Sequence, residues 1–165
     1  MKAMISAPEL HTERLHLLDI TENDADVIVK LRSDPNVYQY FVSPHKITLE
    51  EHLNWFRNIY IYDENRYDWI AFLDNEPIGI FGIKREFHYA DTAEISYILS
   101  PEYYGKGYAK EAVSMLILFC KTEWKCKKVT AEIHKNNTLS INFIKRLSFT
   151  LTEEYGYFLR YEKIL

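Results

Sequence analysis

The chain has 165 residues, of which 47% are hydrophobic and 27% charged, and its formal net charge is -4. This length and composition fit one globular domain, and the acidic balance argues against a nucleic-acid-binding surface. The two cysteines predict neither a disulfide framework nor a metal site, and the longest apolar run, 115–120, is far too short to cross a bilayer.

The predicted elements follow from hydrophobic periodicity and from turn residues. They are, in chain order, a strand at 14–18, a helix at 24–31, a helix starting at Thr48, a hairpin of strands at 69–73 and 77–87, a strand at 93–99, a helix at 106–121, a strand at 129–134, a helix at 137–147, and terminal strands at 149–153 and 157–162. No repeat or linker divides the chain, so residues 1–165 are expected to form a single domain.

The order of these elements predicts the architecture. Residues 93–134 form a strand–helix–strand unit, whose two strands should be parallel with a right-handed crossover. The preceding hairpin is antiparallel, so the sheet of about seven strands should be mixed. The expected fold class is α/β (α+β), a three-layer domain with helices on both faces of the sheet.

The stretch 101–110 leads from the end of a strand directly into a helix and contains Gly105 and Gly107. The first turn of a helix offers free N–H groups and the positive end of the dipole, and glycine lets a ligand approach the backbone. With Lys106 and Lys110 beside it, the loop predicts a phosphate or pyrophosphate site. Its spacing matches neither a P-loop nor a dinucleotide-binding fingerprint. The alternative is a helix start with two turn glycines and no ligand.

Several segments together resemble the GNAT family of N-acetyltransferases over nearly the whole chain. They are Thr12-Glu-Arg-Leu15, Ala93-Glu-Ile-Ser-Tyr97, Pro101-Glu-Tyr-Tyr-Gly-Lys-Gly-Tyr-Ala109, and Asn137-x-x-Ser140 with Phe149 beyond it. Their order and spacing look similar to the branch that includes ribosomal-protein N-terminal acetyltransferases. The resemblance implies a V-shaped splay between the two parallel strands, acetyl-CoA as the cosubstrate and no metal.

The resemblance also implies roles for individual residues. Backbone amides of the phosphate loop would hold the pyrophosphate of coenzyme A: Gly105, Lys106, Gly107, Tyr108, Ala109 and Lys110. The main chain of Tyr97, Ile98 and Leu99 would bond the pantetheine arm like an added strand. Asn137 would also bond the pantetheine arm, and Ser140 would lie near the sulfur.

Three positions depart from the family's pattern. Glu102 stands where Gln or Arg is frequent, and Ser148 stands where many members have a glycine before the Phe. Ile144 occupies the position at which many members carry a tyrosine as the general acid. A tyrosine acid at this position is therefore excluded, and Ser140 is the remaining local candidate.

Acetylation of an amine requires a neutral amine, a polarised thioester carbonyl and a thiolate leaving group. No nucleophile motif is present, so direct attack without a covalent enzyme intermediate is expected. Glu94 is the preferred general base, directly or through a water, and His134 is the second candidate. The structural alternatives are a solvent-facing carboxylate at 94, a histidine that bonds a loop backbone at 134, and a serine at 140 that bonds nearby backbone. A main-chain N–H near Ile98 is expected to polarise the carbonyl.

The N-terminal region through the second helix is expected to form the acceptor side. Its candidates are Tyr38, Tyr40, Phe41, His45, His52, Trp55 and Phe56, of which Trp55 and Phe56 are expected to pack in the core. Two acceptors remain open: a peptide or protein α-amine, and a small amine such as an amino sugar. The amino sugar is suggested by a weaker likeness of 32–36 and 50–55 to acetyltransferases that act on nucleotide-linked amino sugars.

The alternative from another functional class is a non-catalytic module that binds coenzyme A. Residues 1–10 lack the apolar run of a secretory signal, so a cytoplasmic location is expected. No nucleic-acid or membrane partner is expected, and the chain could be a monomer or a homodimer.

Overall fold

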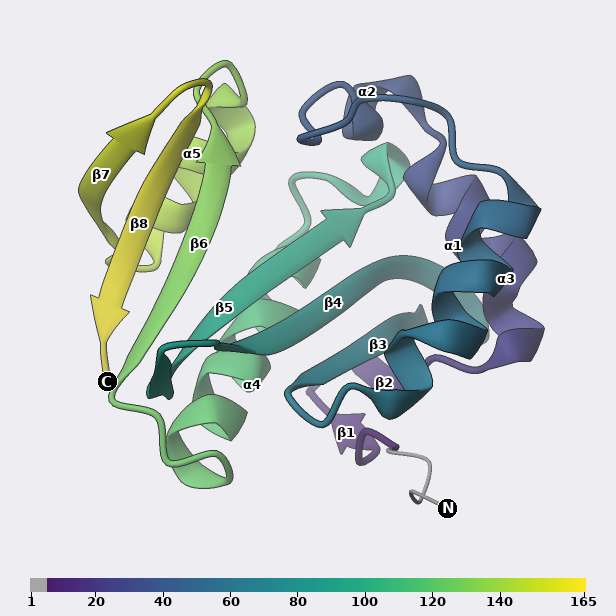
Figure 1. The fold of residues 1–165 in the computed structure, drawn as a ribbon, viewed down its shortest axis with the longest axis horizontal. Helices are drawn as coiled ribbons and strands as arrows, with labels where there is room; N and C mark the ends of the chain where they lie inside the picture. The colour runs from purple at the N-terminus through teal and green to yellow at the C-terminus, as the bar shows by residue number, and fades with distance from the viewer. Residues whose placement is uncertain (1–5) are drawn as a thin grey trace.

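A continuous eight-stranded sheet runs through the computed structural model, which describes residues 6–165 (Figure 1). Residues 1–5 of the predicted domain lie outside the described part. The strand order is β1-β2-β3-β4-β5-β6-β8-β7. The β5–β6 pair is parallel, and the other pairs are antiparallel, so the prediction of a mixed sheet is confirmed.

The elements have the following bounds. The strands are β1 (Leu10–His11), β2 (Leu15–Asp19), β3 (Arg66–Leu73), β4 (Glu76–Glu86), β5 (Tyr89–Leu99), β6 (Lys128–His134), β7 (Thr150–Tyr155) and β8 (Phe158–Ile164). The helices are α1 (Ala25–Arg32), α2 (Pro35–Tyr38), α3 (Leu49–Asn58), α4 (Tyr108–Thr122) and α5 (Thr138–Arg146). Short 3-10 turns are η1 (Glu22–Asp24), η2 (Tyr60–Tyr62) and η3 (Pro101–Tyr103).

The predicted helices and strands are all present, the strand β1 and the helix α2 were not predicted, and the other differences lie at the ends of elements. The helix expected from residue 106 begins at Tyr108, because Gly107 adopts a left-handed φ of 83° and becomes the N-cap. The short helix α2 stands where a turn was expected, since Asp34 caps it and Pro35 occupies its first position. The helix expected from Thr48 is α3, and Thr48 forms a capping box with Glu51 at its start.

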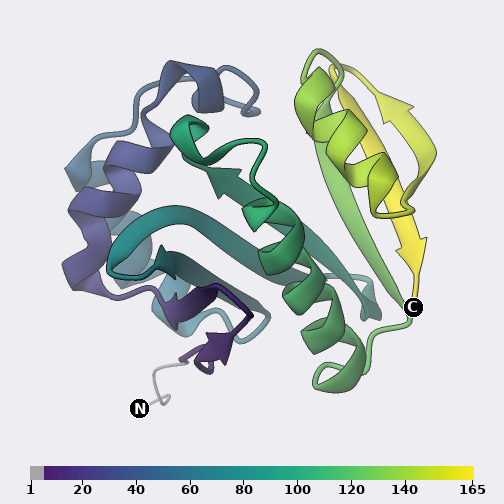
Figure 2. The same cartoon turned by 180° about the vertical axis from the view of Figure 1, so that it is seen from behind.

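Helices cover both faces of the sheet, which confirms the three-layer prediction. Figures 1 and 2 show α1 and α3 on one side and α4 and α5 on the other. Successive side chains of β3 point to opposite faces of the sheet. Trp69 packs in the large cluster with α4, whereas Ile70 packs in a second cluster with α1 and α3. Each fully buried aliphatic side chain contributes about 1.5–3 kcal/mol to these interfaces.

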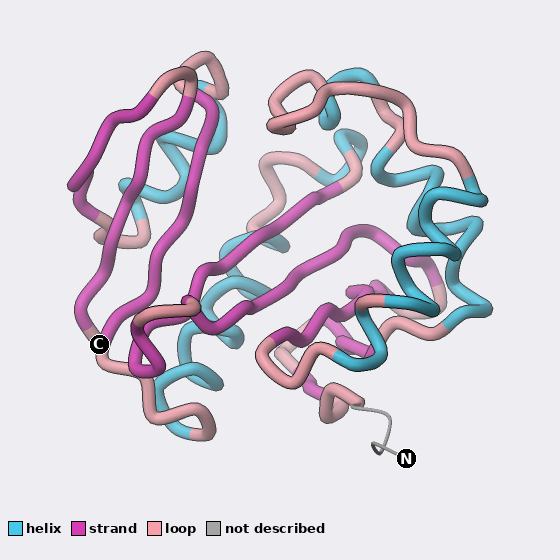
Figure 3. The backbone as a smooth tube through the Cα atoms, in the orientation of Figure 1, coloured by secondary structure: helices cyan, strands magenta, loops and turns pink. Residues whose placement is uncertain are grey.

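The parallel strands β5 and β6 pair over three residues each and then separate. The pairs are Thr92–Lys128, Ala93–Val129 and Glu94–Thr130. Beyond them β5 stays bonded to β4 as far as Leu99, and β6 stays bonded to β8 as far as His134. The two strands therefore diverge (Figure 3), which confirms the predicted V-shaped splay.

The cysteines are both buried and both free, and Cys120 lies on the core side of α4. Within residues 6–165, no helix combines the length and the apolar character needed to cross a membrane.

Candidate active site

A cleft of about 460 Å³ lies where β5 and β6 diverge. Its walls come from both strands, from the start of α5 and from the segment after α1. The cleft brings together five residues that the sequence singled out: Glu94, Tyr97, His134, Asn137 and Ser140. The sheet register explains the placement, since β5 and β6 are the strands that separate.

Two hydroxyl groups meet across this cleft. Tyr97 Oη on β5 lies 2.5 Å from Ser140 Oγ on α5, and the Tyr97 ring packs edge-on against Phe143. Burial raises the pKa of Tyr97 to about 12, so its hydroxyl stays protonated at neutral pH. Sequence reasoning assigned only the main chain of Tyr97 and missed its side chain. The available signal was its spacing, because residues 95, 97 and 99 share one face of the strand, and Ile95 and Leu99 are buried.

The start of α5 fixes the position of Ser140. Asn137 is the N-cap, and its Oδ1 accepts a hydrogen bond from the Ser140 N–H at 3.2 Å. This cap satisfies one of the free amides of the first turn. It also engages the Asn137 oxygen, so the side-chain amide nitrogen is the group left to meet a ligand.

Glu94 stands at the apex of the splay, as the last residue of β5 that pairs with β6. Burial raises the pKa of its carboxyl, and the neighbouring carboxylates Glu132 and Glu86 raise it further, while Arg160 and Arg66 oppose the shift. A raised pKa makes this carboxylate a better proton acceptor at neutral pH. Glu94 is half-buried, so it differs from the solvent-facing carboxylate of the structural alternative.

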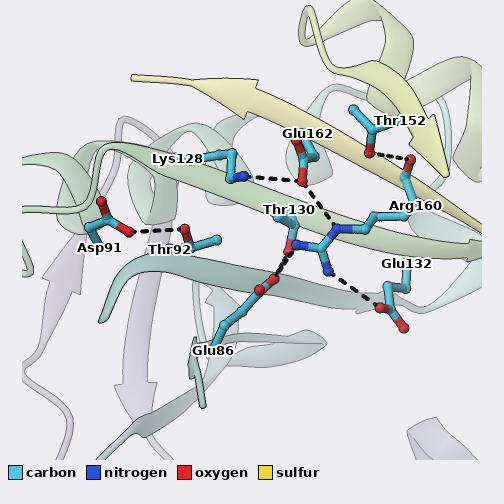
Figure 4. A network of polar contacts seen from close by, with 9 residues as sticks. All are labelled: Glu86, Asp91, Thr92, Lys128, Thr130, Glu132, Thr152, Arg160 and Glu162. Atoms are coloured by element: carbon cyan, nitrogen blue, oxygen red, sulfur yellow. Dashed lines mark hydrogen bonds and ion pairs between the residues drawn. The ribbon is translucent and has the colours of Figure 1, made fainter. Parts of the chain in front are cut away.

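A polar network beside Glu94 shares one guanidinium among several acids (Figure 4). Arg160 lies 2.7 Å from Glu86, 3.1 Å from Glu162 and 3.7 Å from Glu132. Because these three carboxylates divide its charge, Arg160 offsets the ionised form of Glu94 only in part. The network therefore keeps this end of the cleft acidic.

His134 is a poor candidate for the base. Its Nδ1 accepts a hydrogen bond from the Asn136 N–H at 3.1 Å. The neutral ring therefore carries its proton on Nε2 and can only donate there. Its ring also stacks on Tyr157, with centroids 5.9 Å apart. This arrangement matches the alternative in which His134 bonds a loop backbone.

The loop before α4 presents open backbone amides. Gly105 and Gly107 have φ values of 75° and 83°, and a Cβ added to Gly105 would meet nothing within 4 Å. The first bond of the helix runs from Glu111 N to Gly107 O at 3.1 Å. The N–H groups of the residues between them precede this bond and stay available to an anion. Open amides at the start of a helix suit an anionic group such as a phosphate.

Arg14 reaches this loop from a distant part of the chain, which sequence reasoning did not foresee. Its Nη1 donates to Lys106 O at 3.0 Å, its Nε lies 3.4 Å from Glu111, and its guanidinium covers the Tyr108 ring at 4.4 Å. It fixes the loop and adds positive charge beside the amides. The only available signal was its place in the segment Thr12–Leu15 that resembles the family.

The cleft-facing edge of β5 is set by the register with β4. Ser100 N donates to Ile78 O at 2.8 Å, and Ile98 pairs with Ile80. Because main-chain groups alternate in direction along a strand, those of Ile98 point to β4, and those of Tyr97 and Leu99 point to the cleft. The main-chain groups near Ile98 that face the cleft are therefore those of Tyr97 and Leu99, and the main chain of Ile98, which was also expected to bond the pantetheine arm, bonds β4 instead.

A second cavity of about 190 Å³ adjoins the cleft on the side of α1 and α3. Arg32, Phe41, Ser96 and Tyr97 line both spaces. The N-terminal region thus borders the cleft, as expected. Trp55 packs against the second core cluster, as expected, and it also lines this cavity, with the Arg66 guanidinium 5.0 Å above its ring.

The remaining acceptor-side candidates divide between the cleft and the core. Tyr40 and His45 line the cleft. His52 is 1% exposed and Phe56 is 8% exposed, so both lie in the core, as expected for Phe56.

Comparison with known proteins agrees with this geometry. Residues 14–150 match the family model described as an acetyltransferase (GNAT) domain. Uncharacterized N-acetyltransferase p20 of Bacillus licheniformis is 32% identical over 158 residues, covering 93% of this chain and 87% of that protein. Spermidine N(1)-acetyltransferase of Escherichia coli K12 is 26% identical, covering 89% of this chain and 77% of that protein.

A solved structure shares the fold. It is RimL, a ribosomal L7/L12 alpha-N-protein acetyltransferase in complex with coenzyme A, with a TM-score of 0.77, 18% identity, and coverage of 96% of this chain and 98% of that chain. At this identity the likeness concerns the fold, so the branch of ribosomal-protein acetyltransferases gains only weak support. The chain belongs to the GNAT family and is an acetyl-CoA-dependent acyltransferase.

Proposed function

We propose that this enzyme acetylates a small primary amine by direct attack of the amine on the thioester of acetyl-CoA. The observation that carries the proposal is that Glu94, from β5, and Ser140, from α5, line the same cleft. A proton acceptor and a hydrogen-bond donor that border one space are what amine acylation requires.

The binding roles follow from open backbone groups. Amides from Gly105 to Lys110 would hold the diphosphate, aided by the charges of Arg14 and Lys106. The main chain of Tyr97 and Leu99 would bond the pantetheine arm, and one of their N–H groups would polarise the carbonyl. The amide nitrogen of Asn137 would complete the contacts.

Glu94 would accept the proton that the amine loses. An alkylammonium has a pKa of about 10 and is not nucleophilic, so a base is required near neutral pH. The pKa of Glu94 is raised by burial and by Glu132 and Glu86, which brings it closer to the value that suits this task. The acidic environment also attracts the ammonium form of the acceptor.

Ser140 would donate a hydrogen bond to the departing sulfur, which leaves as a thiolate. Its hydroxyl is held by Tyr97 Oη at 2.5 Å, and its main chain is held by the Asn137 cap. Tyr97 is therefore proposed as the positioning residue for Ser140. A serine held by a tyrosine would take the place of the family's tyrosine, which Ile144 replaces here.

The size of the adjoining cavity favours a small amine over a peptide α-amine. Its space of about 190 Å³ is bounded by α1, α3 and the sheet. A small-amine acceptor is also in keeping with the related spermidine N(1)-acetyltransferase.

Two measurements test the proposal together. Calorimetry with acetyl-CoA should show saturable binding, and thiol release should become amine-dependent in a screen of primary amines. Absence of binding would contradict the whole proposal. Binding without turnover of any amine, in a folded wild-type protein, would favour the non-catalytic coenzyme A module instead.

A further inference from the structure

The cavity beside the cleft is bordered by an ion pair whose carboxylate is almost closed to solvent. The Asp68 residue is 4% exposed, and Arg66 Nε lies 2.6 Å from its Oδ2. Gly82 on the neighbouring strand makes room for this carboxylate, because a Cβ there would lie 2.0 Å from Asp68 Oδ1. The carboxylate is thus built into the sheet, and Arg66 neutralises it.

A second guanidinium borders the same cavity without a matching acid. Arg32 projects from the end of α1 and lies 5.2 Å from the centroid of the Phe41 ring. Its Nε is buried and has no hydrogen-bond partner among the described residues. A buried donor left unpaired costs about 1–3 kcal/mol, and more when the group is charged, so the site is incomplete as it stands.

The charges around Arg32 leave the cavity positive. Burial and the charge of Arg66 lower the pKa of Arg32, whereas Asp68 opposes this effect. His52 adds no charge at pH 7, because burial and Arg32 lower the pKa of its ring below the ordinary value. The side chains that line this cavity thus bring two guanidinium groups and one carboxylate, an excess charge of +1 in its walls, while Asp63 acts on Arg66 from outside the lining. An anionic ligand would neutralise it and supply the missing acceptor.

We propose that this cavity binds an oxyanion of the acceptor, a carboxylate or a phosphate, through Arg32 with support from Arg66. The inference rests on the proposed function, since it treats the cavity as the acceptor site. The substrate class is then a primary amine that carries a negative charge at its other end.

The shared walls give the substrate its direction. Arg32, Phe41, Ser96 and Tyr97 line both spaces, so an acid held at Arg32 extends its amine into the cleft. There the acidic Glu94 receives the ammonium group. Positive charge at one end of the site and negative charge at the other match a zwitterion.

The same arrangement disfavours a polyamine. Spermidine would bring an additional ammonium group against two guanidiniums, which repel it at low dielectric. The volume of about 190 Å³ corresponds to roughly six water molecules. It accommodates a small acid or a phosphate, and a complete nucleotide would have to extend outside it.

Matched substrates test the charge preference directly in the wild-type enzyme. Amino acids with the amine at the α, β or γ carbon are each compared with their own amides, glucosamine 6-phosphate is compared with glucosamine, and spermidine is included. The anionic member of at least one pair should have a kcat/KM about tenfold or more above its neutral partner. A preference for amino acids over their amides would identify a carboxylate as the bound anion, and a preference for glucosamine 6-phosphate over glucosamine would identify a phosphate. Equal rates within every pair, or spermidine as the best acceptor, would overturn the proposal.

Variants of Arg32 test whether its guanidinium causes the preference for the anionic substrate of each pair. Arg32→Gln should remove most of the discrimination within a pair, whereas Arg32→Lys should retain part of it. Lys30→Gln removes the same charge from an exposed position of α1 and should leave the discrimination unchanged. Calorimetry with acetyl-CoA and a thermal melt verify that each variant is folded. A preference that survives in folded Arg32→Gln would contradict the role of Arg32.

Equilibrium binding separates this inference from the proposed reaction. If no amine is turned over, N-acetyl-β-alanine and its amide are titrated into the wild-type enzyme with coenzyme A present. Tighter binding of the acid, lost in Arg32→Gln, would support the anion site even though the proposed reaction had failed. Equal binding, or no binding of either, would overturn the anion site.

Discussion

Replacing Glu94 by glutamine tests the base while preserving the shape of the side chain. A positioned general base contributes about 10²- to 10⁴-fold to a rate. Glu132 lines the same cleft and could relay a proton through water, so the loss in kcat is expected near the lower limit, about 10²-fold. Binding of acetyl-CoA should not change, because Glu94 lies outside the phosphate loop.

The pH dependence gives a second signature. The pKa of Glu94 is raised, so wild-type kcat should fall as the pH drops through a limb above the ordinary range of a glutamate. Glu94→Gln should lack this limb. Glu132→Gln is the matched control: it removes a neighbour that raises the pKa of Glu94, so the limb should persist and move to lower pH.

Stability should change in the direction opposite to activity. The pKa of Glu94 is higher in the folded chain than in the unfolded chain, so its ionised form destabilises the native state above that pKa, and the penalty vanishes as the pH falls through it. Glu94→Gln removes the penalty and should keep or raise Tm at pH 7–8, where 1 kcal/mol corresponds to about 2–4 °C.

Stopped-flow or steady-state assays of thiol release, with a thermal melt on the same samples, measure all three effects. If Glu94→Gln keeps kcat within about threefold and retains the acid limb, Glu94 is not the base. A large fall in both kcat and Tm would point to a structural role for Glu94.

Four further substitutions test other parts of the structure. Ser140→Ala should lower kcat by about tenfold or more. Tyr97→Phe should lower kcat less, about two- to tenfold, because one hydrogen bond is lost. A double variant that is no slower than Ser140→Ala would confirm that the two residues act together. Gly107→Val should weaken acetyl-CoA binding in calorimetry, because φ is 83° at this position and a Cβ would lie 3.2 Å from Arg14. Gly156→Ala is the control: its φ is 57° in a remote hairpin, and this change should leave binding intact. Gly82→Ala should lower stability by about 1–3 kcal/mol in denaturant unfolding, because its Cβ would lie 2.0 Å from a buried carboxylate oxygen, and an unchanged midpoint would contradict that contact.

Local patterns in the sequence were enough to place the elements. The capping box of Thr48 and Glu51 marks the start of α3, and apolar spacing marks the core side of α4. The glycine-rich loop before α4 was also found from local chemistry, except that the left-handed Gly107 delays the helix by two residues. Such features depend on neighbours within a few positions, which the sequence displays directly.

The contacts that define the site depend on residues far apart in the chain. Tyr97 and Ser140 are 43 positions apart, and Arg14 reaches Lys106 over 92 positions. Neither contact has a local signature, because sheet register and helix packing bring the partners together.

The amino-acid sequence by itself determined the order of the main strands and helices, the glycine-rich loop before α4 and, through its motifs, the family. The tertiary structure alone decided where β5 and β6 part, which acids surround Glu94, and that Arg32 is buried beside Arg66. Periodicity and capping are short-range properties, and they are readable along the chain. A pKa and a cavity depend on the sum of charges and atoms from every nearby segment, which exists only once the sheet has assembled.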